Sequence, residues 1–383
     1  MKVAVYCQHV LGMGHLFRTL AIVSALAGHE RLLVLGGPPA PVAAPEGVAV
    51  ARLPPLAMDA DFAALTLSGA ALEAAKADRR QRLLAALGAF APDVFFVELY
   101  PFGRKAFEFE LVPAIEAVRA RGGRVVSGVR DILVEKKDQA AYEARVLDRL
   151  GRFFDAVCVH ADPALFPLSE TFSRAGEIAV PVHYTGYVAV GPRPSRAVAA
   201  VRRELGVEEE KALVVASAGG GKVGSQLLAA TLGACRADPR LREAAVRVFS
   251  GPYCPDAAYA ALSAAAAGLP DARVRRFAPD FADILAACDL SLSLAGYNTV
   301  MGLLAAGARG LVFPFDQNRE QRLRASRLAD HGLLGVLDPP DLAPGRLAGR
   351  MLAALGAPKP PRAAVDLDGA RATAVALAAL AGA

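Results

Sequence analysis

Several stretches of the sequence combine glycine with polar residues in an order that suits the binding of an anionic ligand. In one of them, residues 293–307 (SLAGYNTVMGLLAAG), an apolar run passes through Ala295 and Gly296 and continues into Asn298 and Thr299. A glycine before a helix lets a ligand approach the backbone, and the free N–H groups of the first helical turn favour a negative charge. This order predicts a phosphate-binding turn.

A polar cluster follows the next apolar run, GLVFPF, at residues 310–315. In an open α/β sheet, ligands bind beyond the carboxyl ends of the strands. We therefore predict that this turn and residues 293–307 together form a nucleotide-sugar site. The residues of the cluster are Asp316, Gln317, Asn318, Glu320 and Gln321.

A glycine-rich run, SAGGGKVG at residues 217–224, follows another apolar stretch. It lacks the order and spacing of a Walker A loop. Its backbone N–H groups can still form a nest for a diphosphate, with Lys222 as the counter-charge. A flexible turn without a ligand is the alternative, although the position after the first strand of a sheet favours binding. The predicted contacts are Gly219, Gly220, Gly221 and Lys222.

Phe277 follows a further apolar run, in the turn RFAPDF. Its ring can pack on a nucleobase that the amides of this turn hold. It can equally belong to the core, and the sequence leaves both interpretations open.

The sequence offers no carboxylate pair beside the glycine-rich turns that would hold a metal ion. Two DxD patterns, Asp59-Ala-Asp61 and Asp366-Leu-Asp368, lie far along the chain from these turns, and we interpret them as solvated or capping residues. The prediction is therefore a site without metal or cofactor. Helix dipoles, amides and either Lys222 or a nearby arginine would carry the charge of a leaving group there.

A histidine stands directly after two glycines in GMGH, residues 12–15. A helix is predicted to begin here, so that His15 points into a cleft above the sheet and the helix N-terminus disfavours its charged form. A neutral imidazole can accept a proton from a hydroxyl or water, which makes His15 the candidate catalytic base. The alternative is a histidine that only bonds its loop. A dinucleotide site is disfavoured because Gly36 and Gly37, and no acidic residue, follow the next strand.

Polar residues at the ends of other N-terminal strands are candidates for binding an acceptor. The strands of a parallel sheet present their carboxyl ends at one edge, which would face the same cleft as His15. The acceptor-side candidates are Gly12, Gly14, Arg18, Glu98, Tyr100, Arg130 and Asp131. His9, two residues after the first strand, and His160 and His183, at the ends of other strands, are lesser candidates.

Short apolar runs alternate with helical segments along the chain, which predicts parallel sheets covered by helices in two doubly wound α/β domains. The predicted strands span residues 3–7, 32–35, 48–53, 94–97, 124–127, 156–160, 182–184, 213–217, 246–250, 273–277, 290–294, 310–315 and 334–336. The predicted division is an N-terminal acceptor-side domain (1–189), a hinge linker rich in proline (190–198), a C-terminal donor domain (199–366) and a helix that packs across the domain junction (367–383).

The composition fits a cytoplasmic protein with a large core. Of the 383 residues 54% are apolar, yet no run of eighteen apolar residues predicts a spanning helix, and the start MKVAVYCQHV enters a strand and is no signal peptide. The five cysteines are scattered singly, which predicts buried thiols and neither a disulfide framework nor a zinc site. The net charge is 43 − 38 = +5, but basic residues are not interleaved with aromatics, which argues against a nucleic-acid partner.

Taken together, these motifs resemble the GT-B glycosyltransferases, in particular the MurG-like family with a family-28-type C-terminal domain. They look closest to the uncharacterised group of predicted glycosyltransferases within that set. The motifs are, in chain order, GMGH (12–15), YTGYV (184–188), SAGGGKVG (217–224), AGYNTVMGLLAAG (295–307) and PFDQNREQ (314–321).

The resemblance implies two Rossmann-like domains facing across a cleft, a nucleotide-sugar donor on the C-terminal one, and inversion at the anomeric carbon. It matches His15 to a candidate base, and Glu320 and Gln321 to contacts with the donor's sugar hydroxyls. One position departs from it, because relatives usually carry a ribose-holding acidic residue where this chain has Gly302. Another residue such as Glu320 must then do this work, or the donor or its pose differs.

Three functions remain open. The first is a metal-independent inverting glycosyltransferase of the hexosyltransferase class, using a UDP-sugar and a small-molecule, glycan or lipid-linked acceptor. The second is a nucleotide-sugar hydrolase, because GMGHLFRTLAIVSAL (12–26) also resembles the start of sugar-nucleotide hydrolases of pseudaminic acid synthesis. There His15 would activate water, and Arg18 matches the arginine of that run. The third is a non-catalytic nucleotide-sugar-binding protein.

A lipid-linked acceptor would bring the protein to the inner face of a membrane as a peripheral protein of the cell envelope. The best local candidate for that contact is KADRRQRLLAAL, residues 76–87, with Arg79, Arg80 and Arg82. A solvated helix face is the favoured alternative.

Overall fold

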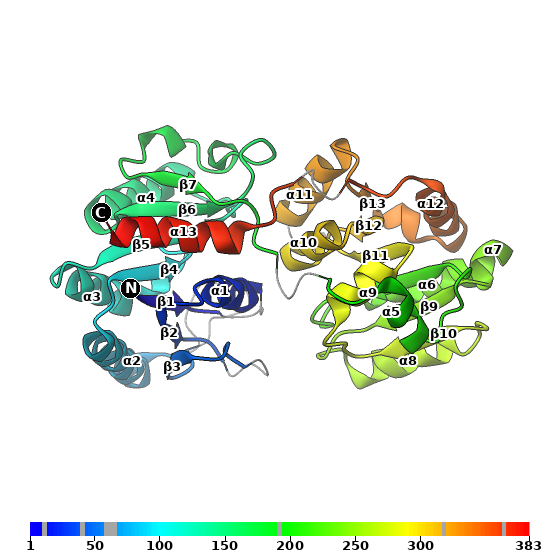
Figure 1. Cartoon of the computed structure of the whole chain (residues 1–383), viewed down its shortest axis with the longest axis horizontal. Helices are drawn as coiled ribbons and strands as arrows, with labels where there is room; N and C mark the ends of the chain where they lie inside the picture. The colour runs from blue at the N-terminus through cyan, green and yellow to red at the C-terminus, as the bar shows by residue number, and fades with distance from the viewer. Residues whose placement is uncertain are drawn as a thin grey trace. The chain divides into compact units, whose positions relative to one another are not determined.

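The computed structural model describes residues 1–9, 14–38, 43–56, 67–189, 194–315, 319–361 and 365–382. The chain divides into two compact units, one of Met1–Ala189 with Asp366–Ala383 and the other of Val190–Val365. Each unit is a parallel sheet with helices on both faces (Figure 1). Because both faces are covered, most strands consist of nearly continuous apolar runs.

The N-terminal unit holds a seven-stranded sheet in the order β3-β2-β1-β4-β5-β6-β7. Its strands are β1 (Lys2–Cys7), β2 (Glu30–Leu35), β3 (Val48–Arg52), β4 (Val94–Glu98), β5 (Arg124–Arg130), β6 (Ala156–His160) and β7 (Val182–Tyr184). Its helices are α1 (Gly14–Ala25), α2 (Gly69–Phe90), α3 (Glu108–Arg119), α4 (Gln139–Phe153) and α13 (Gly369–Ala381). The strand order reverses between β1 and β4, and such a point opens a crevice at the carboxyl ends of the strands.

Alternate residues of β1 face the two helical layers of this unit. Val5 and Cys7 pack with Leu16 of α1 and Leu377 of α13 in one buried cluster. Tyr6, between them, points to the other layer and donates its hydroxyl hydrogen to Glu110 of α3 over 2.5 Å. This packing fixes the start of α1 close to the carboxyl end of β1.

The C-terminal helix belongs to the N-terminal unit. The amide of Tyr187 donates to Asp366 O over 2.7 Å, and Val188 forms a bridge with Asp368. Gly369 lies so close to Tyr187 that a Cβ there would be 2.8 Å from its carbonyl carbon. Helix α13 then packs on α1 and on β4, β5 and β6 (Figure 1). We predicted a helix across the domain junction, but these contacts group it with the N-terminal unit.

The C-terminal unit holds a six-stranded sheet in the order β10-β9-β8-β11-β12-β13, which reverses between β8 and β11. Its strands are β8 (Leu213–Ser217), β9 (Ala245–Phe249), β10 (Ala272–Arg275), β11 (Leu290–Leu294), β12 (Gly310–Phe313) and β13 (Gly335–Val336). Its helices are α5 (Val198–Glu204), α6 (Ser225–Ala237), α7 (Pro239–Arg242), α8 (Asp256–Ala266), α9 (Phe281–Ala287), α10 (Tyr297–Ala306), α11 (Arg319–Asp330) and α12 (Pro344–Gly356).

The predicted strands all occur, and β6, β7, β8 and β11 have the predicted bounds. Strand β12 ends at Phe313 because Pro314 has no N–H to continue the ladder. The last part of the predicted linker is held to α9, because the amides of Ser195 and Arg196 donate to Asp283 Oδ1 over 2.8 and 3.2 Å. All five cysteines are buried, which confirms the prediction of buried thiols.

Candidate active site

The carboxyl ends of β1 and β4 carry a cluster of three ionisable side chains. His15 lies in the first turn of α1, and its Nδ1 is 2.7 Å from Oε1 of Glu98, the last residue of β4. Arg18, three residues further along α1, donates to the same carboxylate oxygen, and its Nη2 lies 3.0 Å from His15 Nδ1. The cluster therefore sits where the strand order of the sheet reverses.

Burial controls the protonation of this cluster. It lowers the pKa of His15 to about 4, although the carboxylate of Glu98 acts in the opposite direction. Burial by itself would raise the pKa of Glu98, but the contacts with His15 and Arg18 hold it well below its usual range. At neutral pH Glu98 is therefore ionised and His15 neutral. Donation of Nδ1–H to Glu98 leaves Nε2 of His15 free to accept a proton.

Tyr100 does not join this cluster, which corrects its assignment to the acceptor side. It is fully buried, its ring centroid lies 5.9 Å from that of Phe154, and its hydroxyl donates to Glu108 over 3.1 Å. Leu99 has a left-handed φ of 69°, so the alternation of the strand does not continue past Glu98. Tyr100 is a core residue.

The other acceptor-side candidates lie at the same edge of the sheet. Arg130 ends β5, Asp131 follows it as a buried residue, and Gly14 is the first residue of α1. Gly12 lies outside the described residues. His160, at the end of β6, is held by Thr185, with 2.9 Å between Nδ1 and Oγ1, and burial lowers its pKa to about 3.

The glycine-rich turn after β8 packs backbone to backbone on the turn after β9. Gly219, Gly221 and Gly224 have φ values of 59°, 88° and 98°, in the left-handed region that favours glycine. A Cβ on Gly221 would lie 2.4 Å from Ser250 O, and Gly220 O accepts from the amide of Tyr253 over 3.0 Å. The turn is thus a fixed shape, which favours the binding interpretation over a flexible turn.

Lys222 extends beside this turn, with Nζ 5.9 Å from the ring centroid of Tyr253. Helix α6 begins three residues later, and its N-cap residue Gly224 has no side chain that could cap the first turn. The N–H groups of that turn, the neighbouring glycines and the ammonium group of Lys222 are groups of the kind that can bind a diphosphate.

The start of α10 supplies a second uncapped helix terminus, at the carboxyl end of β11. Gly296 precedes the helix and forms no side-chain cap. The buried Oδ1 of Asn298 has no hydrogen-bond partner among the residues that the structure describes. Ala295 differs from the prediction, because it is fully buried and its amide donates to Phe313 O over 3.3 Å. It shapes the turn and offers no free amide to a ligand.

The turn after β12 is described only in part. Gln321 of α11 accepts from the amide of Phe315 through Oε1 over 3.2 Å, so its side chain lies at the end of this strand, with Glu320 beside it in sequence. Asp316 and Gln317, together with Asn318, fall outside the described residues. Phe277 is 64% exposed, which excludes the core alternative for its ring.

The acidic residues near α13 have structural partners. Asp366 Oδ1 accepts from the amide of Asp368 over 2.9 Å. Asp368 precedes α13 and pairs over 2.5 Å with Arg371, which lies in the helix. This fits their interpretation as solvated or capping residues, while Asp59 and Asp61 lie outside the described chain. Among the described residues no group of three or more His, Cys, Asp or Glu side chains could hold a metal ion.

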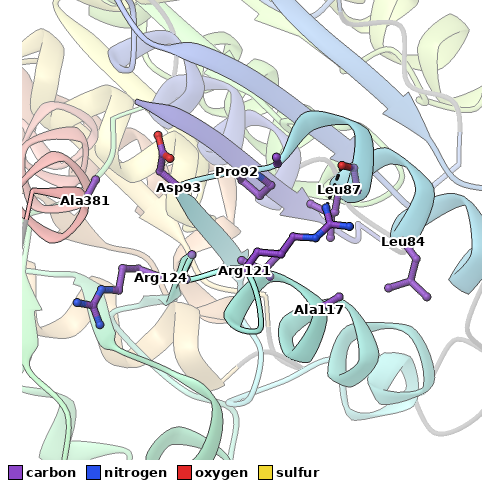
Figure 2. Close-up of a pocket in the computed structure, with 13 residues that line it drawn as sticks. Leu84, Leu87, Pro92, Asp93, Ala117, Arg121, Arg124 and Ala381 are labelled. Atoms are coloured by element: carbon purple, nitrogen blue, oxygen red, sulfur yellow. Dashed lines mark hydrogen bonds between the residues drawn. The ribbon is translucent and has the colours of Figure 1, made fainter.

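A cavity of about 300 Å³ lies at the other edge of the N-terminal sheet, near the amino ends of β4 and β5 (Figure 2). Asp93 and Arg124 line it from the strand starts, and Arg121 donates to Gly88 O over 2.9 Å across it. The strands are parallel, so this cavity is at the opposite end of the sheet from His15 and does not belong to the candidate site.

The sequence did not reveal the partner of His15 or the buried role of Arg79. Glu98 was an acceptor-side candidate, and the structure places its carboxylate in contact with His15. Arg79, which we placed in a membrane-facing basic segment, is fully buried and pairs with Glu110, so it cannot touch a membrane. Its spacing from Leu83 and Leu87, four and eight residues on, is the helical signal that marks this buried face.

No helix in the described ranges has both the length and the apolarity needed to cross a membrane.

Comparisons with known proteins bear on both units. Residues 217–364 match the family model of the glycosyltransferase family 28 C-terminal domain. Over 84 residues the chain is 37% identical to a UDP-N-acetylglucosamine--N-acetylmuramyl-(pentapeptide) pyrophosphoryl-undecaprenol N-acetylglucosamine transferase of Vibrio cholerae serotype O1. That match covers 22% of this chain and 24% of the relative, so the chain spans about a quarter of the length of the curated relatives it matches.

Solved structures match over almost the whole chain. MurG of Acinetobacter baumannii is 17% identical with a TM-score of 0.58, covering 100% of this chain and 98% of its own. CalG4, the calicheamicin glycosyltransferase, is 17% identical with a TM-score of 0.59, covering 99% and 94%. The spinosyn forosaminyltransferase SpnP is 15% identical with a TM-score of 0.60, covering 100% and 95%.

The fold is that of the GT-B glycosyltransferases. Residues 217–364 match the glycosyltransferase family 28 C-terminal domain, and the chain resembles MurG in its fold and in the 84 residues that it shares with the Vibrio cholerae relative. The predicted α/β fold class and the resemblance to the MurG-like GT-B glycosyltransferases are confirmed.

Proposed function

We propose that the protein is a metal-independent inverting glycosyltransferase that transfers a hexose from a UDP-sugar to an acceptor hydroxyl. The observation that carries this proposal is the contact between His15 and Glu98 at the reversal point of the N-terminal sheet. It stands in a chain whose other unit contains a family 28 domain. The N-terminal unit would bind the acceptor and the C-terminal unit the donor.

The proposed reaction needs a base and a stabilised leaving group. Nε2 of His15 takes the proton of the acceptor hydroxyl while its oxygen forms a bond to the anomeric carbon of the donor. The bond from that carbon to the diphosphate oxygen breaks, and the electron pair leaves with the nucleoside diphosphate. Lys222, the amides of Gly219 and Gly220 and the start of α10 stabilise this charge without a metal ion. Glu98 stabilises the imidazolium that forms.

The acceptor is proposed at the level of chemical class. The name of the Vibrio cholerae relative contains a pyrophosphoryl-undecaprenol acceptor, whereas that of CalG4 contains calicheamicin. A small molecule, a glycan or a lipid-linked sugar is therefore proposed here, and a lipid-linked one would place the protein at the cytoplasmic face of a membrane. No nucleic acid is proposed as a partner.

One arrangement favours a nucleotide-sugar hydrolase as a second candidate. His15, Arg18 and Glu98 are all contributed by the N-terminal unit and contact one another, so the base and its partners are complete without an acceptor hydroxyl. Water in place of the acceptor would give a free sugar and the same nucleoside diphosphate.

Release of nucleoside diphosphate separates these functions. The purified protein is incubated with a panel of nucleotide-sugars, with and without small-molecule, glycan and lipid-linked acceptors, in a buffer containing a metal chelator. Release that depends on an acceptor and survives chelation supports the transferase. Steady release without an acceptor supports the hydrolase, and tight donor binding without turnover across the whole panel supports a non-catalytic binding protein.

A further inference from the structure

A buried arginine of α2 joins the three segments that leave the first three strands of the N-terminal sheet. Arg79 Nε and Nη2 donate to the two carboxylate oxygens of Glu110 over 2.8 and 2.5 Å. Nη1 donates to Gly36 O over 2.9 Å and to Pro54 O over 2.5 Å, and Nη2 also donates to Gln8 Oε1 over 2.8 Å. All five N–H donors of the guanidinium are therefore used.

The three acceptors outside α3 share one location. Gln8 follows β1, Gly36 follows β2 and Pro54 follows β3, so all three lie at the carboxyl edge of the sheet. The amide group of Gln8 extends the link, because Nε2 donates to His9 O over 3.2 Å and to Leu56 O over 3.5 Å. The same edge carries His15 and Glu98.

Close packing around Arg79 leaves no room for a different arrangement. A Cβ on Gly36 would lie 2.1 Å from Gln8 Oε1 and 2.7 Å from Arg79 Nη2. A Cβ on Gly37 would lie 2.3 Å from His9 O, and Nε2 of His9 is 2.8 Å from Pro38 O. The segments after β1 and β2 are thus held against each other through glycine backbone.

The charge of Arg79 is matched inside the protein. Glu110 and the Arg79 guanidinium are both fully buried, and Tyr6 donates to the same Glu110 oxygen as Arg79 Nη2. Burial opposes the charge on Arg79, but bonding to Glu110 and Tyr6 keeps its pKa above the usual range. The network is a satisfied ion pair. Such a pair is a weak source of net stability, and its five directed bonds instead define one geometry.

We propose that Arg79 is a positioning residue for the acceptor: by tying the chain after β1, β2 and β3 together, it sets the acceptor-binding edge around His15. The inference rests on the proposed transferase function. Arg79 does not touch the reacting atoms, and it acts through the segments it holds. A small displacement of those segments would misplace the acceptor hydroxyl relative to Nε2 of His15.

The decisive variant is Arg79→Lys. It keeps a positive charge beside Glu110, but an ammonium group has three donors on one atom and cannot reach all of the acceptors that Arg79 holds. Glu110→Gln is the second variant, since it keeps the shape of the partner and removes its charge. Arg82→Lys is the matched control, because Arg82 lies on the same helix, is 59% exposed, and pairs only with Asp78 in the described structure.

Three measurements are made on each variant at a temperature where all are folded. We expect Arg79→Lys to raise KM for the acceptor by roughly 10- to 100-fold, to leave the Kd for UDP unchanged, and to accelerate amide hydrogen exchange after β1, β2 and β3. Arg82→Lys should match the parent in all three. A variant that lowers Tm but keeps the parent's acceptor KM and exchange rates would show a purely structural Arg79 and overturn the inference.

Failure of the proposed function is distinguishable from failure of this inference. If the parent protein transfers no sugar to any acceptor, the transferase proposal fails, and hydrogen exchange still decides whether Arg79 holds the three segments. Faster exchange confined to those segments in Arg79→Lys supports the positioning role. Unchanged exchange rejects it whatever the activity.

Discussion

The carboxyl edges of the two sheets have the same topology and different chemistry. In each sheet the strand order reverses at one point, between β1 and β4 or between β8 and β11. At the first point the structure places ionisable side chains, with His15 and Glu98 in contact. At the second it places glycine backbone, two uncapped helix starts and one lysine.

This difference corresponds to two chemical tasks. Proton transfer needs a group that titrates, and a partly buried imidazole paired with a carboxylate provides one. Holding a diphosphate needs many weak donors in a fixed concave arrangement, and backbone amides provide these without the solvation cost of several buried lysines. The comparison therefore predicts that changes at the first edge alter reactivity, whereas changes at the second alter donor affinity.

The largest effect is expected from His15→Ala. Loss of the general base should lower kcat by roughly 10²- to 10⁴-fold, while the Kd for the donor nucleotide, measured by calorimetry, stays within about twofold. Glu98→Gln keeps the hydrogen-bond geometry but removes the charge that stabilises the imidazolium, so its loss should be smaller. His29→Ala, at a partly buried position in the bend before β2, is the control. If His15→Ala turned over substrate as fast as the parent, the carboxyl edge of the N-terminal sheet would have no catalytic role.

In the unsubstituted protein, acid should lower the free energy of unfolding through two histidines of the N-terminal unit. The folded-state pKa values of His15 and His160, about 4 and about 3, lie below the unfolded value of 6.5. Between pH 6.5 and 4 the unfolded chain therefore binds more protons, and the free energy of unfolding falls as the pH falls. Each histidine contributes a slope of up to about 1.4 kcal/mol per pH unit.

Urea titrations at half-unit steps between pH 7 and 4.5 measure this slope. His15→Gln and His160→Gln should each reduce it, because the substituted side chain no longer titrates. The depressed pKa of Glu98 adds a loss only at still lower pH, as the pH falls through its folded value. A free energy of unfolding that is constant over this range would contradict the buried neutral state of both histidines.

At the C-terminal edge, two neighbouring glycines should respond differently to the same substitution. Gly221→Ala adds a Cβ 2.4 Å from Ser250 O at a φ of 88°, so we expect a loss of about 2–3 kcal/mol of unfolding free energy and weaker donor binding. Gly219→Ala places its Cβ in open space at a φ of 59° and should cost about 1 kcal/mol.

Chemical denaturation and calorimetry with UDP measure both effects, and kcat at saturating donor should change little in either variant. Gly349→Ala in α12 is the matched control. Its Cβ meets nothing within 4 Å, and alanine in a helix should stabilise the unit slightly. Equal unfolding free energies for Gly221→Ala and the parent would show that the turn is not fixed by its packing on the turn after β9.

The local sequence pattern predicted the helices and strands well. The positions of the side chains, in contrast, depend on the backbone turn and on contacts between residues far apart in the sequence. The apolar runs of β8 and β11 gave their bounds because both faces of a doubly wound sheet are covered. Glu98 and Tyr100 looked alike as polar residues after one strand, but the left-handed turn at Leu99 separates them. No spacing rule in the sequence indicates that turn.

Contacts between side chains or amides on neighbouring strands could not be predicted from the sequence either. The contact of Glu98 with His15 joins residues 83 positions apart and depends on β4 lying beside β1. Ala295 was correctly placed in the turn before α10, yet its amide is used by Phe313 of the neighbouring strand. The use of a backbone donor depends on strand register, which composition does not encode.

The smallest predicted effect concerns the position where relatives carry a ribose-binding carboxylate. A Cβ on Gly302 of α10 would make an ordinary contact with Leu285 Cδ1 at 3.6 Å, so the helix has room for a side chain. Gly302→Glu should stabilise α10 by roughly 0.5–1 kcal/mol, because glycine is a poor helix former. It should also supply a new acceptor for the ribose hydroxyls and strengthen UDP binding by roughly threefold to tenfold, about 1 kcal/mol.

Calorimetry with UDP and with 2′-deoxy-UDP, repeated on Gly302→Gln, separates the charged contact from the gain in helix stability. The carboxylate variant alone should prefer UDP over its deoxy form by more than the parent does. Equal preference in both variants would mean that the ribose lies away from α10 and that this chain holds its donor in a different pose. The carboxyl edge of the C-terminal sheet would then differ from that of the relatives in where the ligand lies, as well as in the residue at position 302.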